Sequence, residues 1–202
     1  MPTQIDLSLI QSTSSDPKQP FKIHQVCCGF AYTCIVTDKH KLYACGANDA
    51  GQCGIDKDKQ DVLGFTLVSG LHHKIEKISC GYYHTAALVE NGDLYTWGSS
   101  MYGQTGHGSN QDESNPRLVE SLTGKRMKNI ACGAFHTVAV TDLENVYAWG
   151  RGSKGRLGIN STVDQFSPRL VEALLGKHVT SVSCGHCHTI ALTDSGLLVD
   201  VI

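Results

Sequence analysis

The chain has 202 residues, of which 41% are hydrophobic and 18% are charged, and it contains 21 glycines but only 5 prolines. This balance excludes a disordered or low-complexity chain, and the many glycines predict tight turns. A formal net charge of -2 without a long run of Lys or Arg argues against a nucleic-acid partner, and no apolar stretch is long enough to predict a membrane span.

Residues 1–20 form the first segment, which we expect to be a flexible leader because it contains Ser12-Thr13-Ser14-Ser15 and several prolines. Its apolar residues Ile5, Leu7, Leu9 and Ile10 could instead form one strand at the edge of the unit that follows. The segment lacks the basic stretch and apolar core of a secretory signal. We therefore expect a cytoplasmic or nuclear protein, in which the 9 cysteines are reduced thiols.

From residue 21 onward the sequence repeats itself with a period of 52 residues, without insertion or deletion. The period predicts repeats at about 23–74, 75–126, 127–178 and 179–202, which together form one domain over residues 21–202. Each full repeat holds about four short apolar runs separated by Gly, Pro or Asn-Gly. The runs at 84–89 and 93–97 flank Asn91-Gly92, which predicts a β-hairpin.

Each repeat carries the pattern Cys-Gly-x-x-His-Thr, and the second and third carry Trp-Gly further on; Tyr32 replaces the His in the first. A four-stranded unit with small residues at one fixed place is typical of a β-propeller blade, because blades converge on an axis. We expect the Cys-Gly pairs near that axis and the tryptophans between neighbouring blades. The signature residues are Cys28, Gly29, Cys80, Gly81, His84, Thr85, Trp97, Gly98, Cys132, Gly133, His136, Thr137, Trp149, Gly150, Cys184, Gly185, His188 and Thr189.

The pattern Ile-x-Cys-Gly-x-x-His-Thr-x-Ala-Leu, then Leu-Tyr-x-Trp-Gly, then Gly-Gln-x-Gly resembles the repeat of the regulator of chromosome condensation family, over residues 21 to about 198. Kelch and WD-type repeats are minor alternatives, because the first need a Gly-Gly pair and the second are shorter. The resemblance implies an all-β propeller, which in the family usually has seven blades. This chain would supply about three and a half to four blades of four short antiparallel strands, in an incomplete ring.

The recurring Cys and His side chains are the obvious candidates for metal binding or nucleophilic catalysis. Structural zinc needs four converging ligands, whereas here one Cys/His pair stands at the same place of each successive blade. Tyr32 in the His position would also abolish such a site. We therefore expect small buried thiols and a His that hydrogen-bonds across a hairpin, with no catalytic, metal or cofactor site.

The resemblance implies a non-enzymatic interaction or scaffold module whose partner is a protein, such as a small GTPase or a cytoskeletal or ciliary component. Loops at 56–61, 109–114 and 160–165 would line one face, and self-association could complete the ring. Two alternatives stay open. One is a guanine nucleotide exchange factor for a Ran-like GTPase, although the equal spacing leaves no room for the founding member's inserted β-wedge. The other is the substrate-binding fragment of a larger ubiquitin ligase or kinase.

Overall fold

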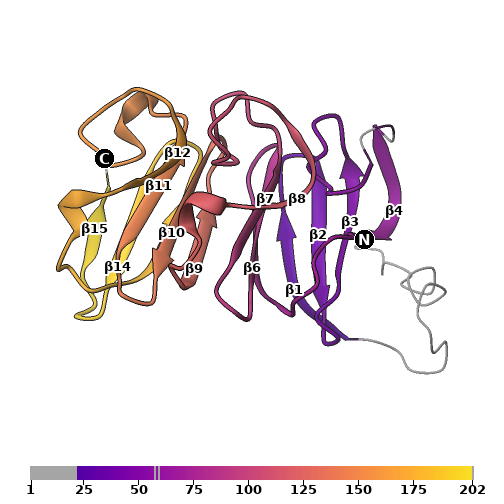
Figure 1. Cartoon of the computed structure of the whole chain (residues 1–202), viewed down its shortest axis with the longest axis horizontal. Helices are drawn as coiled ribbons and strands as arrows, with labels where there is room; N and C mark the ends of the chain where they lie inside the picture. Colours follow the sequence, from indigo (N-terminus) through magenta and orange to yellow (C-terminus); the bar gives the residue numbers. More distant parts are fainter. Residues whose placement is uncertain (1–21, 57, 59, 202) are drawn as a thin grey trace, which may run out of the picture.

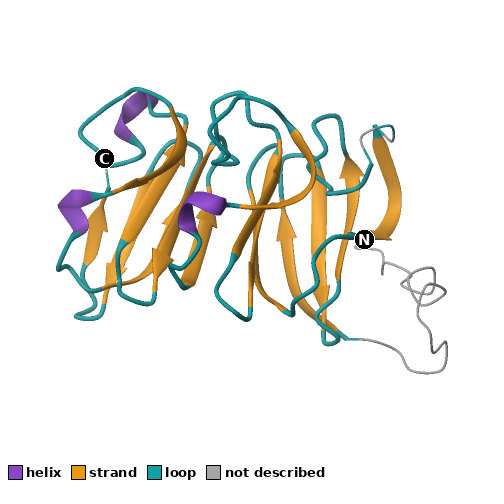
Figure 2. Ribbon diagram, viewed as in Figure 1, coloured by secondary structure: helices purple, strands orange, loops and turns teal. Residues whose placement is uncertain are grey.

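The computed structural model describes residues 22–56, 58 and 60–201, and its strands form four antiparallel sheets (Figures 1 and 2). Each sheet is built from one sequence repeat, and its strands lie in the order in which the chain runs. The sheets stand side by side from the first to the fourth and do not close a ring (Figure 1). The predicted all-β, bladed architecture is therefore confirmed, whereas the expectations for residues 1–20 lie outside the described residues.

Three blades have four strands and the fourth has three. The first comprises β1 (Ile23–Cys28), β2 (Tyr32–Thr37), β3 (Leu42–Ala47) and β4 (Asp61–Leu67). The second comprises β5 (Ile75–Cys80), β6 (His84–Val89), β7 (Leu94–Gly98) and β8 (Glu113–Leu118). The third comprises β9 (Met127–Cys132), β10 (His136–Thr141), β11 (Val146–Gly150) and β12 (Gln165–Leu170). The fourth comprises β13 (Val179–Cys184), β14 (Thr189–Thr193) and β15 (Leu198–Asp200).

Helical structure in the described part is limited to three short 3-10 turns, as the glycine-rich connections predict. These turns are η1 (Glu120–Leu122), η2 (Ser153–Gly155) and η3 (Glu172–Leu174). None of the described helical segments has the length and apolar character that a membrane crossing requires.

The first strands of the blades contact one another and form the inner side of the arc, in the order β1, β5, β9 and β13. The Cys-Gly pairs lie at and just beyond the ends of these strands. There they line a shallow open groove of about 210 Å³, together with Tyr82, Ala134 and His186. The Cys-Gly pairs of all four blades thus meet in one groove.

Most of the hydrophobic core lies in three clusters, one at each boundary between neighbouring blades, and a small fourth cluster in the first blade contains Ile35 and Tyr43. Trp97 lies in the cluster between the first two blades and Trp149 in the next, and both are fully buried. The second strands β6 and β10 are buried on both faces, because a blade packs on either side. This explains why they are apolar apart from His and Thr rather than alternating between polar and apolar residues.

The Gly that follows each Trp allows the close approach of two strands within a blade. Gly98 has φ +98°, and a Cβ there would lie 2.4 Å from the carbonyl oxygen of Tyr83. Gly150 has φ +104°, and its Cβ would lie 2.6 Å from the carbonyl oxygen of Phe135. Only glycine combines this backbone conformation with the absence of a side chain.

Each blade has two distinct ends. The turns β1–β2, β5–β6, β9–β10 and β13–β14 lie at the same end as the long connections β3–β4, β7–β8 and β11–β12, which is the upper end in Figure 1. The loops at 56–61, 109–114 and 160–165 belong to these connections. Any binding surface that they form with the inner turns is therefore on this end.

Candidate functional site

The recurring His and Thr residues connect neighbouring blades by hydrogen bonds. His84 Nε2 lies 3.0 Å from Thr137 Oγ1, and His136 Nε2 lies 2.9 Å from Thr189 Oγ1. In the first blade the hydroxyl of Tyr32 lies 2.9 Å from Thr85 Oγ1. The expectation of a hydrogen bond across a hairpin is therefore wrong. The partners across the hairpin are Gly46, Gly98 and Gly150, which have no side chain to offer.

Each of these Thr hydroxyls donates a hydrogen bond to a backbone carbonyl of the preceding blade. Thr137 Oγ1 lies 2.8 Å from the carbonyl oxygen of Gln104, and Trp149 Nε1 donates to the same oxygen at 3.0 Å. Thr85 and Trp97 share the carbonyl of Gln52 in the same way. Since the hydroxyl proton is used on the carbonyl, the Thr oxygen accepts from the His, so that His84 Nε2 carries a proton.

This arrangement fixes both buried imidazoles in the neutral form. Burial lowers the pKa of His84 to about 4. Burial, together with the nearby Arg156 guanidinium, lowers the pKa of His136 to about 3. Their Nδ1 atoms are buried without a hydrogen-bond partner in the described part of the chain. The rings rest on glycines, because a Cβ at Gly81 or Gly133 would lie 2.1 Å from the His Cε1. These histidines are built for packing rather than for proton transfer.

The buried cysteines of the inner groove are poor nucleophiles. Burial raises the pKa of Cys132 and of Cys184 to about 12, so both thiols stay protonated at neutral pH. A side-chain hydrogen bond with Cys80, together with burial, raises the pKa of Cys27 far above the usual range of a thiol. Within residues 22–56, 58 and 60–201, no three His, Cys, Asp or Glu side chains gather as a metal site would require.

The upper end of the blades carries a row of aromatic rings, which we call the aromatic platform: Phe30, Tyr82, Tyr83, Phe135 and His186. The ring of Tyr82 lies at its centre, with centroids 5.2 Å from Phe30, 5.5 Å from Phe135 and 5.1 Å from His186. The hydroxyl of Tyr82 lies 2.8 Å from His186 Nδ1. The platform therefore joins turns from all four blades into one surface, on which Phe30 is 62% exposed.

Two loop residues extend the platform outward. The Tyr102 ring, in the β7–β8 connection, lies 5.4 Å from the ring of Phe135. The guanidinium of Arg151 lies 4.6 Å from the centroid of Tyr102, which is a cation–π contact. Met101 beside it is 66% exposed. The result is a surface of aromatic, sulfur and cationic groups, the composition found in protein–protein interfaces.

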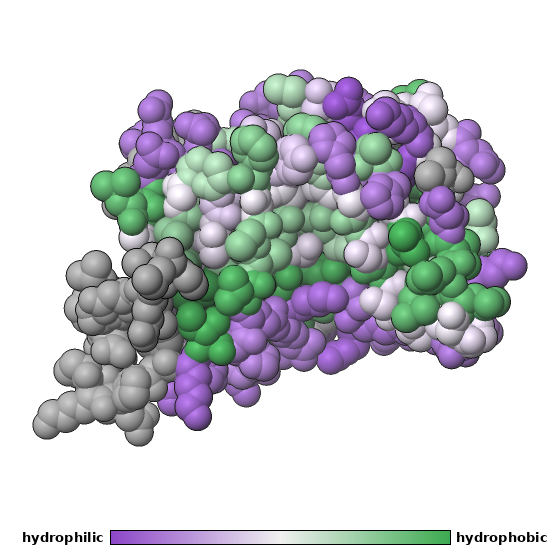
Figure 3. Space-filling model, turned by 180° about the vertical axis from the view of Figure 1, so that it is seen from behind, coloured by the Kyte–Doolittle hydropathy of each residue, from purple (hydrophilic) through white to green (hydrophobic). Residues whose placement is uncertain are grey.

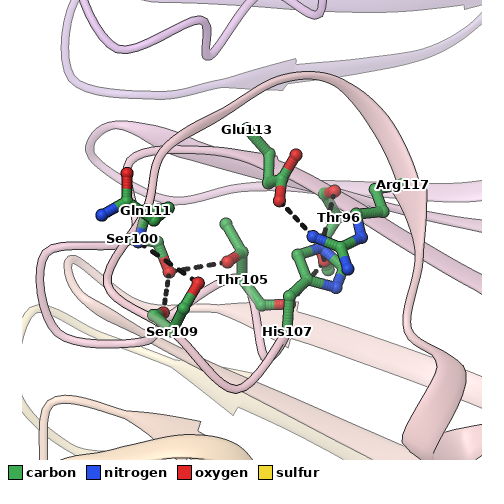
Figure 4. A network of polar contacts seen from close by, with 8 residues as sticks. All are labelled: Thr96, Ser100, Thr105, His107, Ser109, Gln111, Glu113 and Arg117. Atoms are coloured by element: carbon green, nitrogen blue, oxygen red, sulfur yellow. Dashed lines mark hydrogen bonds and ion pairs between the residues drawn. The ribbon is translucent and has the colours of Figure 1, made fainter.

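The β7–β8 connection is held by a network of polar contacts (Figure 4). Ser100 Oγ lies 2.7 Å from Thr105 Oγ1 and 3.0 Å from the carbonyl oxygen of Ser109. His107 Nε2 lies 3.0 Å from Thr96 Oγ1, and burial lowers the pKa of this imidazole. At the end of the loop Arg117 pairs with Glu113. The loop over 109–114 is therefore held by contacts within the β7–β8 connection and the strands that it joins.

The aromatic platform was missed by the sequence analysis, which considered the repeated positions and not the two variable ones between Cys-Gly and His-Thr. Those positions hold Phe30, Tyr82, Tyr83, Phe135 and His186. The available signal was that ring-bearing residues recur at places that vary between copies. Packing does not require a large side chain there, so exposed rings at these positions make a candidate for a binding surface.

The comparisons with known proteins agree with this architecture. Residues 3–199 match the family model of the RCC1-like domain. The chain is 35% identical over 189 residues to human E3 ubiquitin-protein ligase HERC2, covering 91% of this chain and 4% of HERC2. It is 37% identical over 165 residues to the ultraviolet-B receptor UVR8 of Arabidopsis thaliana, covering 79% of this chain and 38% of UVR8.

A solved structure shares the fold. Prp20p from Saccharomyces cerevisiae, described with binding properties toward Gsp1p and histones, superposes with a TM-score of 0.76 at 23% identity, over 86% of this chain and 45% of that chain. The chain thus spans less than half the length of each of these three proteins. The match of the family model over nearly all residues, and the identity to HERC2 and UVR8, show that the chain belongs to the RCC1-like domain family.

Proposed function

We propose that this chain is a non-catalytic protein-interaction module that binds its partner on the aromatic platform. The observation that carries the proposal is the contrast between the recurring signature residues and the residues at the variable positions between Cys-Gly and His-Thr. Most of the recurring residues of the repeat are buried between blades, whereas the variable positions present Phe30, Tyr82 and Phe135 at one end. Large rings that are held rigidly and partly exposed supply contact area at little entropic cost.

The partner class that we propose is a folded protein, with a small GTPase as the first candidate. Support comes from Prp20p, a protein of the same fold that is described with binding to Gsp1p and histones. The net charge of -2 makes a basic protein such as a histone the next candidate. Both partners are consistent with the predicted cytoplasmic or nuclear location.

A second candidate function is the substrate-binding part of a larger ligase. It is favoured by the similarity to HERC2, which extends over 91% of this chain. In that case the platform would again carry the contact, and ligase chemistry would reside elsewhere. Exchange activity on a GTPase is the third candidate, and it would act through surface contacts rather than through a catalytic residue.

The first experiment measures binding of GDP-loaded Gsp1p, and separately of core histones, to the immobilised chain by interferometry. The test variants are Phe30→Ala and Tyr82→Ala, and the control is Leu143→Ala, which changes a residue that is 79% exposed at the opposite end. We expect at least a tenfold rise in Kd for the platform variants and no change for the control. Equal affinities for all variants, or no binding by either partner at tens of micromolar, would contradict the proposal.

The same reagents separate a scaffold from an exchange factor. Release of fluorescent GDP from Gsp1p is followed at increasing concentrations of the chain. An accelerated release that Phe30→Ala abolishes supports exchange activity, whereas binding with an unchanged release rate supports a scaffold.

A further inference from the structure

The β11–β12 connection carries positive charges that the corresponding loops of the first two blades lack. It holds Arg151, Lys154 and Arg156. The residues at the same places of the repeat are all neutral: Ala47, Ala50 and Gln52 in the first blade, and Ser99, Tyr102 and Gln104 in the second. A blade can therefore be built with neutral residues at these places, and packing does not account for the three charges of the third blade.

Arg151 is held against the aromatic platform without using the hydrogen-bond donors of its side chain. Its guanidinium carbon lies 4.6 Å from the ring centroid of Tyr102 and 5.8 Å from that of Phe135. Within the described part of the chain the guanidinium takes part in no ion pair and no hydrogen bond. A cation–π contact uses the charge of the group but none of its five N–H donors, so these remain available to a ligand.

The two rings that hold Arg151 belong to the second and third blades, each of which has all four strands. The arrangement is therefore a property of two complete blades. Hydrophilic residues, drawn in purple, occupy much of the upper end of the molecule (Figure 3). A partner that reaches the rings must also accommodate polar groups, as in interfaces with an aromatic centre and a polar rim.

Arg156, in the same loop, is a buried cation without a carboxylate beside it. It is 2% exposed, and its guanidinium donates to the carbonyl oxygen and the hydroxyl of Ser153, at 2.9 Å and 3.0 Å, and to the carbonyl oxygen of His186 at 3.2 Å. No carboxylate of the described residues lies within ion-pair distance of it. Burial of a charge without a counter-ion is costly, so an anion close to this loop would be favourable.

The carboxylate that lies closest to these charges in the sequence is already engaged. Asp164 Oδ1 accepts a hydrogen bond from the backbone N–H of Gly152 at 2.8 Å. Burial lowers the pKa of Arg156, the charge of Arg151 lowers it further, and Asp164 opposes this effect in part. The two guanidiniums are thus close enough to repel each other, and one carboxylate stands against three cations.

We propose that Arg151 binds a carboxylate of an acidic segment of the partner protein, and that this segment lies across the aromatic platform. The inference rests on the proposed function, because it names the chemistry of the partner at the same site. A carboxylate of Asp or Glu accepts two hydrogen bonds from the planar guanidinium of Arg151, and an adjacent aromatic or apolar side chain contacts Tyr82 and Phe135. Lys154 and Arg156 add positive potential around the carboxylate.

The charge of the whole chain selects a short acidic segment over a nucleic acid. Binding of nucleic acid requires a concentrated basic face, whereas this chain has a net charge of -2. Exposed charges act over about 10 Å at moderate salt, so a short segment on the platform interacts mainly with the third-blade loop. The same local charge disfavours a histone tail and favours a small GTPase, or another protein, that presents acidic residues.

The first experiment selects peptides of about twelve residues from a random library displayed on phage, with the chain immobilised. We expect the enriched peptides to hold at least twice the Asp and Glu content of the unselected library, next to an aromatic or large apolar residue. Enriched peptides without this excess, or the absence of any enrichment, would overturn the inference. Neither result would contradict the proposed function, which is tested separately with folded partners.

The second experiment measures the Kd of the most enriched peptide by fluorescence anisotropy. Arg151→Ser, which introduces the residue of the second blade and should therefore fold, is expected to raise Kd at least tenfold. Arg151→Lys keeps the charge without the planar fork and should give an intermediate Kd. The matched control Arg169→Gln removes one positive charge from an exposed position of β12 and should leave Kd unchanged. Thermal denaturation checks that each variant is folded.

The comparison with Tyr82→Ala separates the inference from the proposed function. A weakened affinity in both Tyr82→Ala and Arg151→Ser supports the acidic segment on the platform. A loss in Tyr82→Ala alone would overturn the role of Arg151 and keep the platform, whereas equal affinity of Tyr82→Ala and the unmodified chain would contradict the platform itself. Replacing Asp and Glu of the peptide by Asn and Gln should weaken binding to the unmodified chain but not further to Arg151→Ser. Tighter binding of labelled single-stranded DNA than of the peptide would overturn the choice of a protein segment.

Discussion

His136 Nε2 lies 2.9 Å from Thr189 Oγ1, so the hydrogen bond of a residue in the third blade ends on the fourth. His84 and Thr137 repeat this relationship one blade earlier. The His-Thr dipeptides of the second and third copies thus face two neighbours, because the His bonds forward and the Thr is bonded from behind. The signature that defines the repeat in the sequence is the means by which repeats hold together.

Removing the Thr137 hydroxyl should lower the stability of the folded protein. Thr137→Val keeps the shape of the side chain but leaves the buried His84 Nε2 without an acceptor, and takes one donor from the carbonyl of Gln104. We expect the free energy of unfolding to fall by about 1–3 kcal/mol, measured by urea denaturation. Thr66→Val is the control, since the Thr66 hydroxyl makes only an exposed local bond, and it should cost less than about 0.5 kcal/mol.

Stability should decrease as the solution becomes mildly acidic. In the unfolded chain a His takes up a proton near pH 6.5, whereas folded His84 and His136 stay neutral down to about 4 and 3. The unfolded state therefore binds more protons below pH 6.5, and the stabilisation present above that pH is lost as the pH falls. Between pH 7.5 and 5.5 we expect a loss of about 2–3 kcal/mol in urea denaturation.

The first blade supplies the matched control for this pH dependence, because Tyr32 occupies the His position there and contacts Thr85. The double variant His84→Tyr, His136→Tyr should keep a hydroxyl for Thr137 and Thr189 while removing both titrating groups. Its stability should change by less than about 1 kcal/mol over the same pH range. An unchanged slope in this variant would assign the acid sensitivity to other groups.

Substitution by alanine should reduce stability to different extents at two glycines with similar backbone angles. Gly98 (φ +98°) has the Tyr83 carbonyl oxygen 2.4 Å from its virtual Cβ, whereas Gly70 (φ +87°) has no atom within 4 Å. Gly70→Ala carries only backbone strain, about 1–2 kcal/mol. Gly98→Ala adds a collision with the backbone and should cost more than about 3 kcal/mol, or prevent folding. Thermal denaturation of both variants compares the two effects.

The β7–β8 loop should loosen locally when its anchor is removed. Asp112 Oδ1 accepts a hydrogen bond from the Ser100 amide at 2.8 Å, and Asp164 does the same for Gly152 one blade later. Asp112→Ala should accelerate amide hydrogen exchange over 99–112 and leave 151–164 unchanged, since each loop has its own anchor. Equal acceleration in both loops would contradict separate anchoring.

The arrangement into blades could be predicted from the sequence because a constant spacing places the same residue types at the same positions of each sheet. Small Cys-Gly pairs and large tryptophans are also compatible with only a few places in a converging array. The partner of the His could not be predicted in this way. That partner, Thr137 for His84, lies 53 residues further on, and the choice between it and a residue of the same hairpin depends on Gly98.

The aromatic platform was even less accessible to sequence reasoning. Tyr82 and His186 meet across one intervening repeat, so their contact arises from the rotation between blades and not from any local pattern. The contacts between variable positions of different repeats can be identified only when the relative positions of the inner turns are known.

Because most of the core lies in three clusters at the boundaries between blades, the blades should unfold locally in a defined order. A blade buries little apolar surface within its own sheet, so its stability depends on the blades beside it. The folding energetics therefore approach those of a one-dimensional array of coupled units. Among the four blades that the structure describes, the second and third have a neighbour on either side, whereas the first and fourth have one. Opening should therefore begin at the outer blades and proceed inward, and amide protection should be greatest along β6 and β10, which are buried on both faces.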